Sequence, residues 1–325
     1  MSEIPGPIST AVLALFTAGA VVLAIAPVDA PTAPPFVQPI VAAQLSADGA
    51  QQLGPAQRAL ADEIIAATQV TEWPELVPSM DDAIAGLQAP APIAACGQVT
   101  RLDAASCSWG DPAAPKSMMV LGNSVAMTYV QLLKNFAEAS DGQWKVSTQA
   151  MFGCEFIDIA KRDASDSIGA ACPGHKEAAI AAVNQARPDV VVIANQFDGA
   201  GSIEWTQATE RLTSQFASNV GKIVFLAAPP GDTRIGECYN RINGPADCIG
   251  KVTQAWLKRS RAVQSLAAKV EGTYIDSRAW FCTTDGYCPS FVGTTPTKRD
   301  SVHMAPEYGA KISPAFTEAM RESGF

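Results

Sequence analysis

From residue 96 to the C-terminus, short apolar runs alternate with longer segments in which apolar residues recur at helical spacing. The runs VVVIA and IVFLAA are apolar at every position, which is typical of strands covered on both faces. This pattern predicts an α/β fold of three α/β/α layers, in which helices cover both faces of a parallel sheet. Strands are predicted at 117–122, 144–150, 189–194, 222–228 and 273–276, and helices at 125–139, 175–187, 204–219, 250–270 and 306–322.

The beginning of the chain has a different pattern. Residues 8–26 form a run of nineteen residues without a charge, about enough to cross the hydrocarbon core of a bilayer as a helix. The alternative is a cleaved signal peptide, but no Lys or Arg precedes the run and a proline follows it. We therefore predict a transmembrane helix or anchor within residues 1–26.

Residues 27–95 connect this anchor to the alternating part. Residues 27–40 contain five prolines, which predict an extended linker. Residues 41–95 carry helical patterns such as GPAQRALADEIIAATQ, which predict a small helical stalk or brace. The expected domains are therefore the anchor at 1–26, the linker and stalk at 27–95, and the α/β domain at 96–325.

The composition limits the classes of function to consider. Apolar residues make up 48% of the chain, enough for a sizeable core and too many for wholesale disorder. Asp and Glu total 32 against 23 Lys and Arg, a formal net charge of -9, and no basic cluster occurs. Binding to nucleic acid through phosphate contacts is therefore not expected.

The eight cysteines fall into four pairs that are close in sequence. Eight cysteines allow roughly a hundred pairings, so local pairing is a preference based on short loops and not a deduction. A zinc site is the alternative, but no pair has C-x-x-C spacing and the chain contains only two histidines. Disulfides indicate an oxidising compartment, so the main domain is expected in the periplasm or cell envelope. The expected pairs are Cys96 with Cys107, Cys154 with Cys172, Cys238 with Cys248, and Cys282 with Cys288.

Ser124 lies at the junction between the first predicted strand and the helix that follows it. In parallel sheets, ligand sites collect at the carboxyl ends of strands. One interpretation of Ser124 is a helix N-cap, whose hydroxyl oxygen accepts a backbone N–H from the first turn. The other is a nucleophile whose developing oxyanion faces the positive end of the helix. The junction alone leaves both interpretations open.

His303 follows Asp300 at Asp-x-x-His spacing near the end of the chain. Such a loop can bring the carboxylate to one imidazole nitrogen and leave the other to take a proton from a serine hydroxyl. The alternative is a helix-capping aspartate beside an incidental surface histidine. Together with the strand–serine–helix turn, in the chain order Ser, Asp, His, the pattern favours a catalytic triad.

VLGNSVA near the start of the α/β part and RDSVHM near its end resemble motifs of the SGNH (GDSL-type) hydrolase superfamily. More narrowly, WPELVPSMDDAI, CSWGDPAAPKSMMVLGNS and FCTTDGYCPSFVGTTPTKRDSVHM are similar to the extracytoplasmic SGNH domain fused to acyltransferase-3 membrane proteins of actinobacteria. The resemblance covers roughly residues 70 to 325. It implies an SGNH fold, which is flavodoxin-like, with Ser124 as the nucleophile and Asp300 and His303 as the other members of the triad.

The resemblance also implies an oxyanion hole made of the nucleophile's own N–H, a glycine N–H and an asparagine side chain. Gly153, after the second predicted strand, matches the glycine, and it also fits a loop position that requires a positive φ. Asn195, at the end of the third predicted strand, lies near where the asparagine is expected, although the family's Gly-x-Asn-Asp spacing is not reproduced. The expected hole is therefore Ser124, Gly153 and Asn195.

The activity implied by the resemblance is transfer or removal of O-acyl groups, usually acetyl, on cell-envelope glycans or glycolipids. No cofactor and no metal is implied. The implied partners are an acyl donor, an envelope glycan or glycolipid acceptor, and an integral-membrane acyltransferase-3 domain or protein. We therefore expect a membrane-anchored, extracytoplasmic acyltransferase or esterase that works through an acyl-enzyme at Ser124.

Two departures from the family pattern favour a different function. The family's Gly-Asp-Ser is Gly-Asn-Ser here, with Asn123 in place of the aspartate. Val125 follows the serine, where relatives of the fused type often have histidine. The alternative function is therefore a catalytically inactive SGNH fold that binds glycans or acts as a scaffold.

Four further residues are expected to have minor or structural roles. His175 is expected in the first turn of a helix beside a disulfide, and Trp280 and Phe281 are expected to pack in the core. Asp198 ends a predicted strand, so it either lines the cleft or caps the following turn.

Overall fold

The computed structural model describes residues 53–100, 103–159 and 166–325, which belong to one compact unit. The expected membrane helix at 8–26 and the proline-rich linker at 27–40 lie outside the described residues. Within the described ranges, no helix combines the length and the apolar composition needed to cross a membrane. The anchor therefore stays a prediction.

A sheet of six strands forms the centre of the unit, in the order β1-β3-β2-β4-β5-β7. Neighbouring strands are parallel except β1 and β3, which are antiparallel. The five parallel strands are those that the sequence predicts. The sixth strand, β1, was not predicted and is antiparallel, so the expectation of a purely parallel sheet is wrong at this one strand. The strands are β1 (Ser108–Gly110), β2 (Lys116–Gly122), β3 (Trp144–Thr148), β4 (Val190–Ala194), β5 (Lys222–Leu226) and β7 (Thr273–Ile275).

The order of the parallel strands creates a switch point at the carboxyl edge of the sheet. Counted along the chain, these strands lie in the order second, first, third, fourth, fifth, which is the doubly wound, flavodoxin-like order. The chain leaves β2 towards β3 on one side and returns to β4 on the other side. The loops after β2 and β4 therefore diverge, and a ligand site is expected between them.

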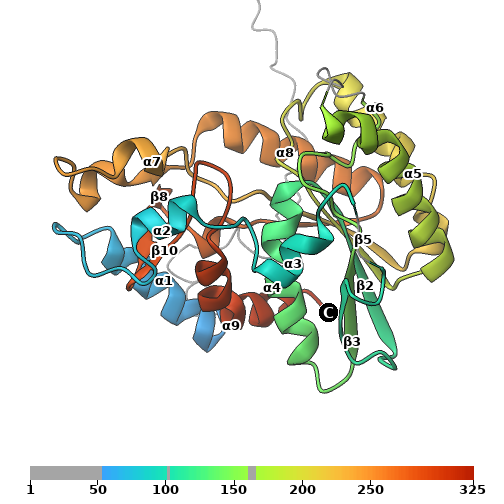
Figure 1. Ribbon diagram of the computed structural model, residues 1–325, viewed down its shortest axis with the longest axis horizontal. Helices are drawn as coiled ribbons and strands as arrows, with labels where there is room; N and C mark the ends of the chain where they lie inside the picture. The colour runs from blue at the N-terminus through green and yellow to red at the C-terminus, as the bar shows by residue number, and fades with distance from the viewer. Residues whose placement is uncertain (1–52, 101–102, 160–165) are drawn as a thin grey trace, which may run out of the picture. The chain divides into compact units, whose positions relative to one another are not determined.

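Helices cover both faces of the sheet (Figure 1). Alternate side chains of β2 enter different cores: Met118 and Val120 lie in the first core, and Met119 and Leu121 in the second. This is the expected α/β/α layering, around a mixed and mostly parallel sheet. The first core includes residues of α4 (Ser124–Glu138) and α9 (Pro306–Glu322), and the second includes residues of α5 (Ser167–Ala186), α6 (Ile203–Thr213) and α8 (Gln254–Lys269).

Two helices begin away from the predicted residues, each for a local reason. α5 begins at Ser167 and not at residue 175, because Asp166 caps it by accepting the Gly169 amide at 2.6 Å. α8 begins at Gln254 and not at residue 250, because residues 250 and 251 pair as a strand. That strand is β6 (Gly250–Lys251), and its antiparallel partner is β8 (Tyr287–Cys288).

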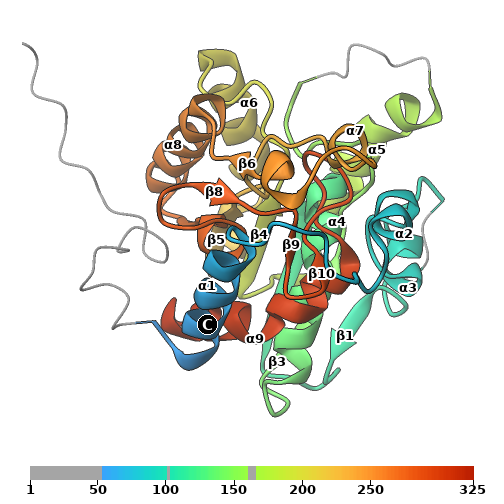
Figure 2. The same cartoon turned by 90° about the vertical axis from the view of Figure 1, so that its left-hand side faces the viewer.

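The helical segment before residue 96 packs against the α/β part; α1 lies beside α9 (Figure 2). Glu318 of α9 accepts hydrogen bonds from the amides of Ala56 and Gln57 at 3.0 and 2.9 Å. These contacts are those of a brace and not of a free stalk, and we call residues 53–95 the brace. The expected domain boundary at residue 96 stays a prediction. The brace contains α1 (Pro55–Ala67) and α2 (Met80–Ala85), and it ends within α3 (Ala91–Cys96).

All four expected disulfides are present. Cys96–Cys107 joins α3 to the residue before β1, and Cys154–Cys172 joins the loop after β3 to α5. The other two, Cys238–Cys248 and Cys282–Cys288, lie in the long loops after β5 and β7. The disulfides therefore constrain loops at the carboxyl edge of the sheet. These loops also contain α7 (Ile235–Cys238), β9 (Phe291–Val292), β10 (Thr295–Pro296) and the short 3-10 turns Pro245–Cys248 and Arg278–Trp280.

Candidate active site

The turn between β2 and α4 places Ser124 at the first residue of the helix. Gly122, the last residue of β2, has a φ of 136°, and a Cβ there would lie 1.8 Å from the Ala194 carbonyl oxygen of β4. Only glycine therefore allows the two strands to approach this closely before the turn. The N-cap is Asn123, whose Oδ1 accepts the Val125 amide at 3.0 Å. The interpretation of Ser124 as the N-cap is therefore wrong.

Ser124, His303 and Asp300 form a continuous chain of hydrogen bonds. Ser124 Oγ lies 2.8 Å from His303 Nε2, although the two residues are 179 positions apart in the sequence. His303 Nδ1 lies 2.7 Å from Asp300 Oδ2. The His303 side chain is 15% exposed, so most of the ring is shielded while solvent still reaches it. The structure thus brings the three predicted residues together at the start of α4.

The turn that carries Asp300 also orients its carboxylate. Oδ1 accepts the amides of Val302 at 2.8 Å and His303 at 2.7 Å. Burial by itself would raise the pKa of Asp300, but hydrogen bonds from the His303 ring and from these two amides lower the pKa to about 2.

The ionised carboxylate fixes the tautomer of the imidazole. A carboxylate can only accept hydrogen bonds, so His303 Nδ1 carries the proton that is donated to Asp300 Oδ2. Nε2 then presents its lone pair and accepts the hydrogen bond of the Ser124 hydroxyl. This is the tautomer that a general base requires.

Gly153 follows β3, the strand on one side of β2. The Met151 amide donates to the Gly122 carbonyl oxygen at 3.0 Å, which joins the end of β3 to the turn before Ser124. Gly153 has a φ of 71°, so the expected loop glycine with positive φ is confirmed. Among the described residues, the amides of Ser124 and Gly153 have no hydrogen-bond partner.

Asn195 follows β4, the strand on the other side of β2. It comes directly after Ala194, which pairs with Gly122. Its Oδ1 accepts the Phe156 amide at 3.1 Å, and this contact assigns the orientation of the buried side-chain amide. The Nδ2 group is therefore the end that is turned away from Phe156, and no described residue accepts its hydrogen bonds.

Lys298, two residues before Asp300, supports the same turn, and sequence reasoning missed it. Its buried ammonium donates to the carbonyl oxygens of Pro230 at 2.8 Å and of Gly231 and Ser301 at 3.3 Å. Burial is the main cause that lowers the pKa of Lys298 to about 8, although nearby carboxylates act in the opposite direction. The consecutive Lys and Arg before Asp300 were the only sequence signal for this support.

Arg299 was also missed. Its Nη2 donates to the Ile84 carbonyl oxygen at 3.1 Å, and its Nη1 donates to the Gly86 carbonyl oxygen. The turn that carries the candidate base is therefore attached to the end of α2, in the brace.

A family model described as SGNH domain (fused to AT3 domains) matches residues 95–318. The chain belongs to this SGNH family. The match runs from the end of α3 into α9, so it includes the sheet and the three hydrogen-bonded residues. The predicted family is confirmed, while an actinobacterial origin stays a prediction.

Several solved structures are similar to this SGNH domain at low identity. The periplasmic domain of a lipopolysaccharide acetyltransferase from Salmonella ser. Paratyphi A is 14% identical, with a TM-score of 0.44, and the match covers 64% of this chain and 82% of that one. A carbohydrate acetylesterase from Sinorhizobium meliloti is 15% identical, with a TM-score of 0.42 and coverages of 65% and 100%. An aryl esterase from M. smegmatis is 13% identical, with a TM-score of 0.42 and coverages of 63% and 98%. A search of curated proteins found no match.

The four minor candidates lie outside the hydrogen-bonded chain. His175 lies inside α5 and not in its first turn, because the helix begins at Ser167; its Nε2 is 2.7 Å from the Gln149 carbonyl oxygen. Asp198 accepts a hydrogen bond from Arg259 at 3.4 Å. Trp280 and Phe281 are buried in the first core, as expected. Within the described ranges, no group of three or more His, Cys, Asp or Glu side chains is arranged to hold a metal ion.

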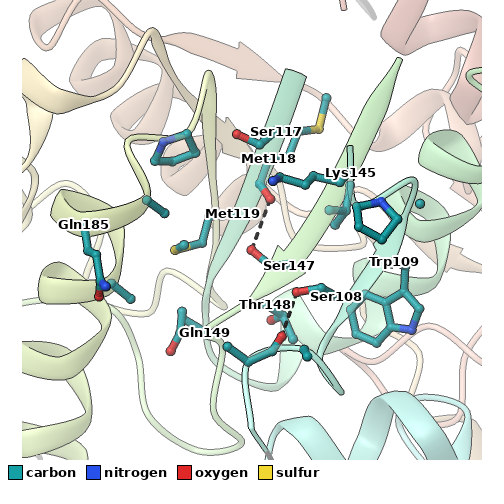
Figure 3. A pocket seen from close by; sticks show the side chains of 18 residues that line it. Ser108, Trp109, Ser117, Met118, Met119, Lys145, Ser147, Thr148, Gln149 and Gln185 are labelled. Carbon is teal, nitrogen blue, oxygen red and sulfur yellow. Dashed lines mark hydrogen bonds between the residues drawn. The ribbon is translucent and has the colours of Figure 1, made fainter. Parts of the chain in front are cut away.

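A pocket of about 690 Å³ lies beside β3 and is lined by residues of β1, β2, β3 and α5 (Figure 3). None of the buried residues of the second core belongs to β3. Met119 of β2 belongs to that core, but its neighbour Ser147 on β3 is polar and lines the pocket. Lys145, Gln149 and Gln185 add further polar groups, and no triad residue lines the pocket. The sequence pattern did not predict this pocket, which is separate from the candidate active site of the SGNH domain.

Proposed function

We propose that this SGNH domain is a serine-dependent enzyme that transfers or hydrolyses O-acyl groups. Ser124 is the nucleophile, His303 is the general base, and Asp300 orients the base. The observation that carries the proposal is the hydrogen-bond chain, 2.8 Å from Ser124 Oγ to His303 Nε2 and 2.7 Å from His303 Nδ1 to Asp300 Oδ2. Both distances are in the range expected for a nucleophile, its base and the group that orients the base.

In the proposed reaction, His303 Nε2 takes the hydroxyl proton as Ser124 Oγ attacks the carbonyl carbon of an acyl ester. The carbonyl π electrons move onto its oxygen and form a tetrahedral oxyanion. When the oxyanion collapses, the bond to the alcohol breaks, and the alcohol leaves with the proton from His303. The Asp300 carboxylate stabilises the imidazolium between these two transfers. The product of this half-reaction is an acyl ester of Ser124.

We also propose that the oxyanion binds to the Ser124 amide, the Gly153 amide and Asn195 Nδ2. Two observations support this set: the groups follow three adjacent strands, β3, β2 and β4, and no described residue accepts hydrogen bonds from them. The first turn of α4 adds the positive end of a helix. Removing one donor from such a site typically lowers the rate by about two to three orders of magnitude.

The substrate class is proposed from the family. Because these SGNH domains are fused to AT3 domains, we propose that an integral-membrane acyltransferase delivers an acyl group, most simply acetyl. The acceptor hydroxyl of a cell-envelope glycan or glycolipid, or water, then resolves the acyl-enzyme. Four disulfides support a location outside the cytoplasm.

Ser124→Ala tests the proposal. A fluorophosphonate should label the wild-type protein once per molecule, at Ser124, and the protein should hydrolyse 4-nitrophenyl acetate. The variant should lose the label and at least about three orders of magnitude in kcat, with an unchanged thermal midpoint, because Oγ forms the new bond. Ser147→Ala, at a half-buried serine of β3, is the matched control. It should still be labelled by the fluorophosphonate and still hydrolyse 4-nitrophenyl acetate. Turnover that survives in Ser124→Ala would rule out the mechanism.

The alternative, an inactive fold that binds glycans, predicts no labelling together with intact affinity for envelope glycan. The departure at residue 123 gives this alternative little support, because Asn123 caps α4 through its Oδ1 without needing a charge. Transfer and hydrolysis are then separated by adding a deacylated envelope glycan and measuring whether acyl groups appear on the glycan or as free acid.

A further inference from the structure

Arg299 links the turn that carries Asp300 and His303 to the brace. Its guanidinium donates to the carbonyl oxygens of Ile84 and Gly86, at the last turn and the C-cap of α2. Carbonyl groups at the end of a helix lack partners within the helix, and they favour a positive charge. The rigid fork of a guanidinium can hold two such oxygens at once, which the single ammonium of lysine does less well.

The remaining nitrogen of Arg299 faces the triad. Nε lies 3.9 Å from Asp300 Oδ2, the same oxygen that accepts the hydrogen bond from His303 Nδ1. Nε is buried and has no hydrogen-bond partner among the described residues. Burying Nε without a hydrogen-bond partner costs free energy. The hydrogen bonds from Nη1 and Nη2 to α2 offset this cost and hold Nε close to the carboxylate. The Arg299 amide also donates to the His303 carbonyl oxygen at 3.0 Å, which closes the turn.

α2 is a fixed support for these bonds. Met80 is fully buried and forms a small apolar cluster with Ile235 and Cys248. The helix begins with a cap, in which Ser79 Oγ accepts the Asp82 amide at 3.1 Å. The acceptors of Arg299 therefore sit on an element that is packed independently of the sheet.

We propose that Arg299 is a positioning residue for the triad, and that the brace, through the carbonyls of Ile84 and Gly86, sets the geometry between Asp300 and His303. This inference rests on the proposed function of Ser124 and His303. The Asp300 side chain is 42% exposed, so packing alone holds it weakly. Displacement of a catalytic group by about 1 Å can lower a rate by about a hundredfold. The brace is thus part of the active-site support as well as of the fold.

Three variants test the inference. Arg299→Gln removes the charge and the two-pronged contact with α2, and Arg299→Lys keeps the charge but not the fork. Arg321→Gln is the matched control, because Arg321 donates to the Ala139 carbonyl oxygen at the C-cap of α4, away from Asp300. We expect Arg299→Gln to react with fluorophosphonate about ten- to a hundredfold more slowly, with a similar loss in kcat and little change in KM. Arg299→Lys should lie between this variant and the wild type.

The imidazole itself supplies a second measurement. The chain has two histidines, so proton and nitrogen NMR can assign the Nδ1–H that His303 donates to Asp300. We expect this downfield signal to weaken or broaden in Arg299→Gln well below its thermal midpoint, and to stay unchanged in Arg321→Gln. A purely structural role would lower the thermal midpoint of Arg299→Gln and leave the signal and the labelling rate of the folded protein unchanged.

The outcomes separate this inference from the proposed function. Wild-type labelling and an unaltered Nδ1–H signal in Arg299→Gln would overturn the inference while Ser124 remained the nucleophile. If the wild type itself does not react at Ser124, the proposed function fails, and the NMR signal still decides the role of Arg299. If Arg299→Gln does not fold, Arg299→Lys decides by the same two measurements, and wild-type behaviour in both refutes the inference.

Discussion

Asp300 divides its contacts between its two carboxylate oxygens. Oδ1 accepts hydrogen bonds from two backbone amides of its own turn, and Oδ2 accepts one from the ring N–H of His303. Backbone amides in a short turn have little freedom, so they fix the carboxylate more firmly than a flexible side chain would. The backbone of this turn therefore orients the carboxylate, and the contacts of Arg299 with α2 attach the turn itself to the brace.

The depressed pKa of Asp300 predicts how stability depends on pH. The folded pKa is about 2 and the unfolded value is 3.8, so the stabilising contacts are fully present above about pH 4 and are lost as pH falls towards 2. For a carboxylate that is 42% exposed, solvent screening reduces the contribution to about 1 kcal/mol. Asp300→Asn should therefore be less stable than the wild type at pH 6 in urea unfolding, and the gap should close near pH 2.

Asp285→Asn is the control for this experiment, because the exposed Asp285 has no hydrogen-bond partner among the described residues. The difference in the free energy of unfolding between Asp285→Asn and the wild type should not close as the pH falls from 6 to 2. A gap between Asp300→Asn and the wild type that stays constant from pH 6 to 2 would contradict the assignment of these hydrogen bonds to the ionised carboxylate.

At the scale of residues, sequence reasoning expected Ser124, Asp300 and His303 to meet. The strand–serine–helix junction and the Asp-x-x-His spacing are local features, and the resemblance to SGNH hydrolases pairs them across 179 positions. The catalytic roles of these residues, and of Gly153 and Asn195, stay predictions. Lys298 and Arg299 were missed because their partners are backbone carbonyls from distant segments, at Pro230 and Ile84. Any side chain can lie near a carbonyl, so no residue type in the sequence marks the acceptor.

At the scale of elements, the turn from β2 to α4 depends on the close approach of β2 and β4. Gly122 allows this approach, and Asn123 begins the helix directly after it. Ser124 therefore follows a strand end whose position is set on one side by Ala194 and on the other by the hydrogen bond from Met151.

Gly122→Ala should disrupt this junction. The new Cβ would lie 1.8 Å from the Ala194 carbonyl oxygen at a φ of 136°, so the strands would have to separate. We expect a loss of at least about 3 kcal/mol in the free energy of unfolding, from backbone strain and overpacking together. Gly199→Ala is the control: its φ is also positive, at 62°, but its nearest neighbour is 3.6 Å away. Equal losses in the two variants, measured by urea unfolding, would show that the contact with β4 is unimportant.

The elements that the sequence predicted well are those whose pattern is decided by burial. β4 and β5 are apolar on both faces, so their continuous runs mark strands without knowledge of the fold. β1 has only three residues, half-buried or exposed, and it forms because β3 offers a free edge. The start of α8 was misplaced for a similar reason, because Gly250 and Lys251 become a strand only when Tyr287 and Cys288 lie beside them.

At the scale of the whole described unit, the brace is part of the first core. Leu60 and Ile64 of α1 are buried in the same core as Phe316 of α9. The polar side of the contact is Glu318, which caps the start of α1 from a distant helix. The sequence showed a helical pattern in residues 54–69 but not its docking, because the capping group is more than 260 positions away.

Glu318→Ala tests whether the brace and the α/β part unfold together. The variant removes two charge-assisted hydrogen bonds from the positive end of α1, and we expect a loss of about 1–2 kcal/mol. Because α1 shares the first core, the loss should shift one cooperative transition, with fluorescence and far-UV circular dichroism giving the same midpoint. Glu177→Ala, at an exposed position of α5, should leave that midpoint unchanged. Two separate transitions, with only the first shifted in Glu318→Ala, would mean that the brace is a stalk that folds on its own and that Arg299 is anchored to a separable element.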